Sequence, residues 1–349
     1  MFKPKKKTSL GARLSGQRKA VGGSAADLVK MKPLIEGGNL PLLIEPQVDG
    51  LQLTTWVQSN LKELHEKLGI HGGLLFRGFN VTRAEEFETF IHAFSTGPPL
   101  KYRDSSSPRS PVSGNIYTST DYPPHTAIRL HSESSYSHVW PMKLFFFCHT
   151  SPDQGGQTPI ADIRQVFNRI PEPIRNRLQE KKIMYTRSFG EGYGLTWQNA
   201  YKTDNRQELE AFLKDADISF QWHGPEVLRT QQIRSAWQQH PLTGETVWFN
   251  HACFFHHSSL DDGIRGQMLE QLGEDALPFN ARYGDGDPFE PNTITLLREA
   301  YDAEMVSFPW EQGDVLALDN MLTAHGRAPF IGNRKILVGM TEPYDGGSL

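Results

Sequence analysis

The sequence contains little cysteine and no long apolar run. Only two of its 349 residues are cysteine, Cys148 and Cys253, and neither belongs to a Cys-x-x-Cys pair. This excludes a disulfide-stapled small domain and argues against a zinc site built from thiolates. Both cysteines stand among aromatic residues, so we expect buried free thiols and a reducing, cytoplasmic compartment. The densest apolar run, Leu144–Cys148, is far shorter than the roughly 20 residues that cross a bilayer, so we expect no membrane span.

Acidic residues are missing from the first part of the chain. Residues 1–26 carry seven Lys or Arg and no Asp or Glu, whereas the remaining chain carries 29 basic and 40 acidic residues. We therefore predict a basic, mobile N-terminal arm over residues 1–30, without the apolar stretch that a secretion signal needs. A tail that binds nucleic acid or a membrane surface is the alternative for this arm. The acidic remainder argues against an enzyme that acts on nucleic acid.

Turn-forming residues, in contrast, are plentiful. The 31 glycines and 23 prolines predict many turns, and therefore β structure with long loops. With 38% hydrophobic and 22% charged residues, the composition is that of a globular protein with a sizeable core. We find no internal repeat and no low-complexity linker, so we predict a single domain over residues 31–349 with a helical insert around residues 200–300.

Hydrophobic periodicity and turn residues divide this domain into elements. We predict helices over residues 54–68, 82–94, 162–178 (interrupted by proline), 207–216, 264–272 and 294–303. We predict strands over residues 72–79, 142–149, 245–250, 315–319 and 335–340. Residues 97–125 are expected to form a long irregular segment, which in a compact domain is usually functional. Residues 320–334 are expected to connect the last two strands and to place a histidine in a turn.

The triplet His131-Ser132-Glu133 is the first indication of metal-ligand chemistry. In an extended segment, residues i and i+2 point to the same side, so this imidazole and this carboxylate could bind one metal ion. The triplet is weak evidence alone, because chance produces a His-x-acid arrangement in a chain with 13 histidines and 40 acidic residues. A distant histidine, His325, follows the predicted strand 315–319. Two histidines and one carboxylate in this pattern are typical of the facial triad that holds non-haem Fe(II).

Two further residues could bind a carboxylate near such a metal ion. Arg334 stands at the start of the last apolar strand, and a fixed guanidinium binds a carboxylate with two parallel hydrogen bonds. Thr158, in a Gly-Gly-Gln-Thr turn sequence, could add a hydroxyl to the same carboxylate. Such a turn is common, so it gains weight only from its occurrence together with the triad and the arginine.

These stretches resemble the taurine dioxygenase (TauD/TfdA-like) branch of the Fe(II)/2-oxoglutarate-dependent oxygenases over roughly residues 70–345. Within that branch, the sequence is most similar to the amino-acid hydroxylases of nonribosomal-peptide pathways, such as the syringomycin-type aspartyl hydroxylases. The resemblance rests on GGLLFRGF at 72–79, HSESSYSHVWPMKLFFFC at 131–148, GGQTPIADIR at 155–164, VWFN at 247–250 and GDVLALDNMLTAHGRAPFIGNRKILV at 313–338.

The resemblance implies a fold, cofactors and site residues. The implied fold is α+β, mainly β, with a double-stranded β-helix (jelly-roll) core and flanking helices. The implied cofactors are Fe(II), the cosubstrate 2-oxoglutarate, and O2. His131, Glu133 and His325 are implied as the catalytic metal ligands, and Thr158 with Arg334 as the anchor of 2-oxoglutarate.

Other residues are candidates for contact with the substrate. Asn250 ends the VWFN stretch, Ser132 lies between two ligands, and Arg327 follows His325 by two residues. For Arg327 the alternative is a structural ion pair, for which Asp319 is the nearest candidate in the sequence. Three more histidines could contact the substrate or form a second metal site: His251, His256 and His257.

We therefore predict a dioxygenase that hydroxylates an unactivated C–H bond of an amino acid or an amino-acid-derived small molecule in secondary metabolism. Succinate and CO2 would be released, and the substrate could be free or tethered to a carrier protein. Desaturation, cyclisation and epimerisation are the alternatives that use the same chemistry, and a non-catalytic jelly-roll binding module is a remote one. Carrier proteins are acidic, so docking one would require a basic patch, which the N-terminal arm could supply.

Overall fold

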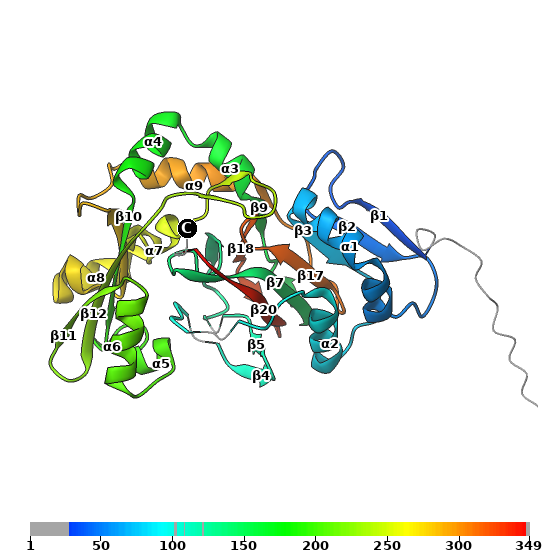
Figure 1. Ribbon diagram of the computed structural model, residues 1–349, viewed down its shortest axis with the longest axis horizontal. Helices are drawn as coiled ribbons and strands as arrows, with labels where there is room; N and C mark the ends of the chain where they lie inside the picture. The colour runs from blue at the N-terminus through cyan, green and yellow to red at the C-terminus, as the bar shows by residue number, and fades with distance from the viewer. Residues whose placement is uncertain (1–27, 101–102, 108, 121, 347–349) are drawn as a thin grey trace, which may run out of the picture.

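Two β-sheets form the centre of the molecule (Figure 1). The computed structural model describes residues 28–100, 103–107, 109–120 and 122–346. The larger sheet has the strand order β1-β2-β3-β17-β7-β20-β5-β4, and its neighbouring strands are antiparallel except for β2 and β3. Its strands are β1 (Val29–Pro33), β2 (Leu42–Pro46), β3 (Gly73–Phe76), β4 (Pro111–Ser113), β5 (Ile116–Thr118), β7 (Val139–Thr150), β17 (Val315–Asp319) and β20 (Lys335–Asp345).

The smaller sheet has four antiparallel strands in the order β16-β9-β18-β6. They are β6 (Ile128–His131), β9 (Ile160–Asp162), β16 (Met305–Val306) and β18 (Thr323–Arg327). Apolar side chains from the two sheets share one buried cluster, in which Ile160 of β9 joins Phe146 of β7 and Leu316 of β17. The α+β, mainly β class and the double-stranded β-helix core are thus confirmed.

Strand β7 has an unbroken apolar run because it is buried on both faces. Phe145 and Phe147 belong to the cluster under the helices α1 (Leu53–His71) and α2 (Ala84–Phe94). Leu144, Phe146 and Cys148 belong to the cluster between the sheets. Successive side chains of a strand point to opposite faces, so a strand covered on both sides needs no polar alternation.

Helices α1 (Leu53–His71) and α2 (Ala84–Phe94) cover the outer face of the large sheet (Figure 1). They confirm the helices predicted over 54–68 and 82–94, with ends displaced by a few residues. Gly72 caps the C-terminal end of α1, and its φ of 71° allows its backbone N–H to bond the carbonyl of Leu68. Glycine adopts this left-handed conformation without the strain that a Cβ brings.

A third sheet, β11-β12-β10-β15, lies at the opposite end of the molecule from β1 (Figure 1). The region 200–300, expected to be a helical insert, supplies both helices and strands. The third sheet consists of β10 (Ile183–Phe189), β11 (Ser219–His223), β12 (Val227–Arg234) and β15 (Phe279–Tyr283). The remaining helices are α3 (Ile163–Arg169), α4 (Glu172–Lys181), α5 (Trp197–Tyr201), α6 (Arg206–Asp215), α7 (Ala252–Phe255), α8 (Asp262–Leu272) and α9 (Thr293–Ala303). The short strand pairs are β8 (Gln154–Gly155) with β19 (Phe330–Ile331) and β13 (Gln238–Gln239) with β14 (Thr246–Val247).

Four element predictions need correction. The helix predicted over 162–178 is two helices, because Pro171 starts α4 anew. Of the strand predicted over 245–250, only the two residues of β14 pair. Within 97–125, β4 and β5 form a short hairpin at the sheet edge. The predicted turn before Arg334 holds the strand β18, whose five residues are all buried.

The predicted N-terminal arm lies outside the described residues except for its last three. Of these, Val29 and Lys30 already belong to β1 and pair with Pro46 and Glu45 of β2, so the ordered domain begins earlier than residue 31. Within the described part of the chain, no helix has the length and apolar character needed to cross a membrane.

Candidate metal centre and cosubstrate site

His131, Glu133 and His325 lie together at one end of the small sheet. His131 is the last residue of β6, and His325 stands directly opposite it on β18 in the antiparallel register. The centroids of the two imidazole rings are 4.5 Å apart. Glu133 is in the turn that follows β6, and one ligand atom from each of the three side chains lies within 4.8 Å of the others. This spacing fits a single bound metal ion.

The protonation states of the two histidines also fit a metal ion. Burial is the main cause that lowers the pKa of His131, and it lowers the pKa of His325 well below its usual value. The imidazoles are therefore neutral near pH 7, the form in which histidine binds a metal. The Nδ1–H of His131 donates to the carbonyl oxygen of Arg129 at 2.8 Å, which leaves its Nε2 as the ligand atom.

Asn320 fixes the turn that carries Glu133. Its Oδ1 accepts from the backbone N–H of Glu133 at 2.8 Å, and its Nδ2 donates to the carbonyl oxygens of Glu133 and Pro141 at 2.9 Å each. The side chain is fully buried. Sequence reasoning assigned Asn320 no role, although it stands in the stretch before His325.

Arg109 is a second residue of this site that sequence reasoning missed. Its Nη2 donates to Oε2 of Glu133 at 2.7 Å, and the two side chains are only 6% and 5% exposed. Arg109 lies in the segment 97–125, which was expected to be functional from its length and irregularity alone. No motif marked this arginine, since its partner is distant in the sequence.

Arg334 and Thr158 are brought together beside the triad. Arg334 immediately precedes β20 and donates to Oγ1 of Thr158 at 3.3 Å, to Oγ of Ser119 at 3.1 Å and to the carbonyl oxygen of Gly156 at 2.7 Å. Trp310 Nε1 donates to the same Thr158 hydroxyl at 3.1 Å, which fixes its position.

The electrostatics of Arg334 fit an anionic cosubstrate. Burial, followed by the charge of Arg327, lowers the pKa of Arg334 to about 10. Within the described ranges, no carboxylate forms an ion pair with this guanidinium. A partly buried cation whose partners are hydroxyls and a carbonyl oxygen is suited to a carboxylate ligand such as that of 2-oxoglutarate.

A cavity of about 30 Å³ joins these groups. Among its lining residues are His131, His325, Thr158, Arg327 and Arg334, five of the residues that the sequence singled out. Arg109, Ser119 and Phe146 also line it.

The candidate substrate contacts differ in their placement. Asn250 is buried and holds the backbone, since it bonds the carbonyl of Ala236 and the N–H of Ala252. Ser132 is also buried, and neither residue lines the cavity described above. Their roles toward the substrate stay predictions.

Arg327 lines the cavity, but its terminal nitrogens bind backbone. They donate to the carbonyl oxygens of Thr120, Tyr122, Pro123 and Thr126. The alternative of an ion pair with Asp319 is wrong, because Asp319 binds His240. Arg327 therefore holds Thr120 and residues 122–126 against β18.

The three histidines after the VWFN stretch do not form a metal cluster among the described residues. His251 is buried and packs its ring 5.3 Å from that of His131, with its Nδ1 3.0 Å from the hydroxyl of Ser135. His256 and His257 contact each other farther along the chain. His251 is thus a neighbour of the predicted metal ligands rather than part of a second site.

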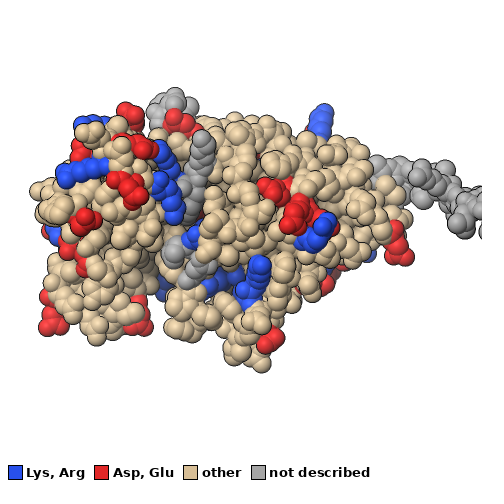
Figure 2. Space-filling view, turned by 90° about the horizontal axis from the view of Figure 1, so that it is seen from below, with Lys and Arg blue, Asp and Glu red and all other residues tan. Residues whose placement is uncertain are grey.

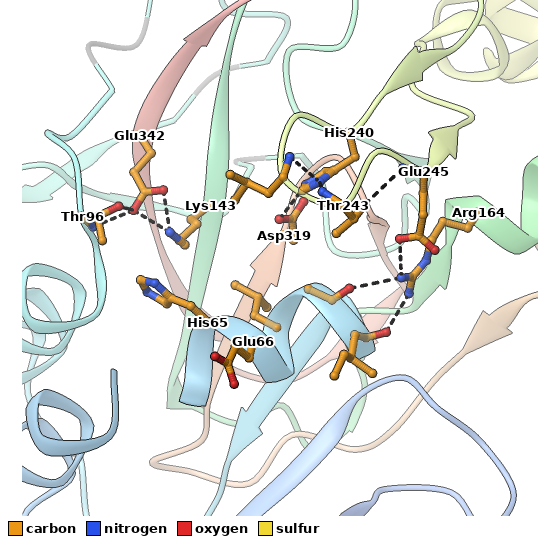
Figure 3. Close-up of a pocket in the computed structure, with 14 residues that line it drawn as sticks. His65, Glu66, Thr96, Lys143, Arg164, His240, Thr243, Glu245, Asp319 and Glu342 are labelled. Atoms are coloured by element: carbon orange, nitrogen blue, oxygen red, sulfur yellow. Dashed lines mark hydrogen bonds and ion pairs between the residues drawn. The ribbon is translucent and has the colours of Figure 1, made fainter. Parts of the chain in front are cut away.

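A larger cavity of about 860 Å³ lies on the helix side of the large sheet (Figure 3). Its wall contains three pairs of polar groups that already satisfy one another: Lys143 with Glu342, His240 with Asp319, and Arg164 with Glu245. Its lining shares no residue with the cavity at the triad.

Comparison with known proteins identifies the family. The family model described as "Taurine catabolism dioxygenase TauD, TfdA family" matches residues 36–341. The chain belongs to the TauD/TfdA family. It is 34% identical over 313 residues to the dapdiamide synthesis protein DdaC of Enterobacter agglomerans. The aligned region covers 90% of this chain and 94% of that protein. It is 30% identical over 291 residues to a clavaminate synthase-like protein of Arabidopsis thaliana, covering 80% and 83%.

Solved structures of low sequence identity share the TauD-like fold. The structure of PvcB, described as an Fe, alpha-ketoglutarate dependent oxygenase from an isonitrile synthetic pathway, matches with a TM-score of 0.54 at 16% identity and covers 97% of this chain and 98% of that one. A taurine dioxygenase from Burkholderia xenovorans matches with a TM-score of 0.54 at 17% identity, covering 90% and 89%.

Membership of the TauD/TfdA family establishes the enzyme class. The protein is a 2-oxoglutarate-dependent dioxygenase whose cofactors are Fe(II), 2-oxoglutarate and O2. The remote alternative of a non-catalytic binding module is thereby excluded.

Proposed function

We propose that this dioxygenase hydroxylates an unactivated C–H bond of an amino acid or amino-acid-derived small molecule in secondary metabolism. The observation that carries the proposal is the convergence of His131, Glu133 and His325 beside Arg334. The pathway class is supported by the similarity to a dapdiamide synthesis protein.

Each site residue has a role in this proposal. His131, Glu133 and His325 bind Fe(II), and Arg334 with Thr158 holds a carboxylate of 2-oxoglutarate. Bound Fe(II) supplies O2 activation coupled to the conversion of 2-oxoglutarate to succinate and CO2. Asn320 keeps the Glu133 carboxylate aimed at the ion through the backbone of the turn. Phe146, whose ring centroid is 5.2 Å from that of His325, keeps water from the imidazole.

The proposal is tested first by cosubstrate binding and turnover. Anaerobic addition of Fe(II) and 2-oxoglutarate should give the weak visible charge-transfer band of the chelate, and admission of O2 with substrate should give succinate. His131→Ala should lose the bound iron, the band and succinate formation together. His92→Ala, at an exposed position on α2, is the matched control and should keep all three. Retained iron and activity in His131→Ala would contradict the ligand assignment.

The substrate and the outcome of the reaction are tested by a product screen. Amino acids, both free and tethered to a carrier protein, are incubated with the enzyme and analysed by mass spectrometry. Hydroxylation adds one oxygen atom, whereas desaturation or cyclisation removes two hydrogen atoms and epimerisation leaves the mass unchanged. A screen in which every product lacks the added oxygen would contradict hydroxylation.

The form in which the substrate reaches the enzyme, free or tethered to a carrier protein, is a further part of the proposal. If the basic N-terminal segment docks an acidic carrier protein, deletion of residues 1–24 should lower turnover of tethered substrate and spare that of free substrate. Unchanged turnover of tethered substrate after the deletion would remove this docking role. We infer a cytoplasmic location, which the two buried free cysteines support.

A further inference from the structure

Asp319, the last residue of β17, is a buried carboxylate in the turn that leads from β17 to β18. Figure 2 shows Asp and Glu side chains at the surface, where water solvates them, whereas the side chain of Asp319 is only 7% exposed. A buried carboxylate is costly unless hydrogen bonds satisfy its oxygens. Its Oδ1 accepts from the backbone N–H groups of Met321 and Leu322 at 2.9 and 3.1 Å. These two bonds shape the turn over residues 319–322.

His240 supplies the donor for the other oxygen of this carboxylate. It stands in the connection between β13 and β14, and its side chain is 1% exposed. Its Nδ1 accepts from the backbone N–H groups of Leu242 and Thr243 at 3.3 and 3.1 Å, so this nitrogen carries no proton. The proton is therefore on Nε2, which donates to Oδ2 of Asp319 at 3.1 Å (Figure 3).

The same turn carries Asn320, whose side chain holds the backbone of Glu133. Oδ1 of Asn320 accepts from the N–H of Glu133, and its Nδ2 donates to the carbonyl oxygen of Glu133. The turn ends where β18 begins, and β18 carries His325. A displacement of the turn would therefore reach two of the proposed metal ligands, one through Asn320 and the other through β18.

We propose that His240 is a positioning residue of the metal site, which acts through Asp319. Without the Nε2 donor, Oδ2 of Asp319 would be buried without a partner, and the carboxylate would rotate toward another donor. Its bonds to the backbone of the turn would then weaken, and Asn320 would no longer hold Glu133 in place. The inference rests on the proposed function, since it requires Glu133 and His325 to be metal ligands.

Two substitutions separate the two hydrogen bonding roles of this imidazole. In His240→Asn, the amide oxygen can replace Nδ1 as acceptor, but the side chain is too short to reach Asp319. In His240→Gln, the amide nitrogen can replace Nε2 as the donor to Asp319. His65→Asn is the matched control, because His65 lines the same large cavity as His240 but donates from Nε2 to the carbonyl oxygen of Phe94, on α2, at 2.8 Å.

Mn(II) is titrated calorimetrically into each full-length, metal-free variant. His240→Asn should weaken Mn(II) binding about 10-fold, the lower end of the range that is usual when a group orienting a metal ligand is lost. His240→Gln should restore most of the affinity, because it keeps the donor to Asp319. His65→Asn should bind Mn(II) as the wild type does, although urea denaturation should show that it too has lost stability.

Asp319→Asn tests the route from His240 to the turn. Its Oδ1 still accepts from the backbone of the turn, but its amide N–H now faces the Nε2–H of His240. This variant should weaken Mn(II) binding as His240→Asn does. The double variant should bind no more weakly than either single one, because residues that act in one network are not additive. Losses that add in the double variant would contradict the route through Asp319.

The outcomes separate this inference from the proposed function. A wild-type enzyme that binds no Mn(II) contradicts the proposed metal site itself. A wild type that binds Mn(II), with equal binding in His240→Asn, contradicts only the positioning role of His240. Equal losses in His240→Asn and His240→Gln also overturn that role, since the donor to Asp319 would then be without effect. A loss of the same size in His65→Asn would assign the effect to a general loosening of the fold.

Discussion

At the scale of single residues, Gly156 shows how closely the backbone approaches the proposed cosubstrate anchor. Its φ is 67°, and an added Cβ would lie 2.7 Å from Cγ of Pro152 and 2.9 Å from Cδ of Arg334. We expect Gly156→Ala to weaken 2-oxoglutarate binding, because the methyl group displaces the arginine. The measurement is an anaerobic titration of the visible chelate band.

Gly50→Ala is the matched control for this substitution. Gly50 has a φ of 74°, but nothing lies within 4 Å of a Cβ built on it. Gly50→Ala should lose about 1–2 kcal/mol of unfolding free energy from the left-handed backbone, and Gly156→Ala should lose more because of its two close contacts; urea denaturation measures both. Only Gly156→Ala should lose affinity for 2-oxoglutarate, and equal affinities would speak against the contact with Arg334.

Asn320 makes a second prediction at this scale. Asn320→Ala removes both hydrogen bonds that fix the backbone of Glu133. We expect Mn(II) affinity to fall about 10- to 100-fold, as is usual when a group that orients a metal ligand is lost. Asn39→Ala removes an amide that also donates to a backbone carbonyl, that of Ile70, but at an exposed position. Mn(II) affinity is measured by titration calorimetry of each metal-free variant, and the Asn39→Ala control should bind Mn(II) as the wild type does.

The residues that sequence reasoning found and missed differ in a physical respect. His131, Glu133, His325 and Arg334 carry a chemistry that few arrangements of residues can supply, and their spacing indicated it. Arg109 acts through a partner that only the folded chain brings near, and a single arginine in an irregular segment carries no spacing signal.

At the scale of elements, the two faces of β7 lead us to expect different effects when adjacent phenylalanines are replaced. Phe145 packs against Phe90 and Phe94 of α2, with ring centroids 5.9 and 5.6 Å away, whereas Phe146 lines the cavity at the triad. Each Phe→Ala substitution should lower the unfolding free energy by about 3–5 kcal/mol. Only Phe146→Ala should change Mn(II) affinity under native conditions. A change of similar size in Phe145→Ala would contradict the separation of the two faces.

Elements with strong periodicity were predictable, and short buried ones were not. The amphipathic pattern of α1 and the apolar run of β17 allowed both elements to be predicted from the sequence. For β17 the predicted bounds were also correct. Strand β18 has the sequence Thr-Ala-His-Gly-Arg, which lacks apolar alternation because its side chains serve the site. Its pairing with β6 and β9, rather than local propensity, makes it a strand.

At the scale of the whole molecule, a half-buried histidine makes stability depend on pH. Burial, with the charges of His257 and Arg298, lowers the pKa of His256 from 6.5 to about 3. Below pH 6.5 the unfolded chain takes up a proton that the folded chain does not, so the unfolding free energy falls as the pH falls toward 3. His256→Gln should flatten this decline, as measured by urea denaturation at pH 7.5 and 5. His92→Gln, exposed on α2, should leave the decline unchanged, and a flattening there would count against the assignment to His256.

The arrangement of the strands into sheets could be predicted only from the resemblance to a family. Composition and turns indicated β structure, but the order of eight strands in the large sheet follows from pairings between distant segments, such as β3 with β17. The third sheet, β11-β12-β10-β15, was not anticipated as a unit, since its strands alternate with helices in a region that looked helical.

His131 and His325 stand directly opposite each other, and the strand pairing that places them does not depend on their side chains. Backbone hydrogen bonds between β6 and β18 set the distance between the two positions, and the imidazoles contribute nothing to that pairing. A glutamine in place of one histidine can therefore abolish turnover while the chamber around it keeps its shape. Such an inert protein would let crystallographers capture the natural reactant intact and read its identity directly from electron density.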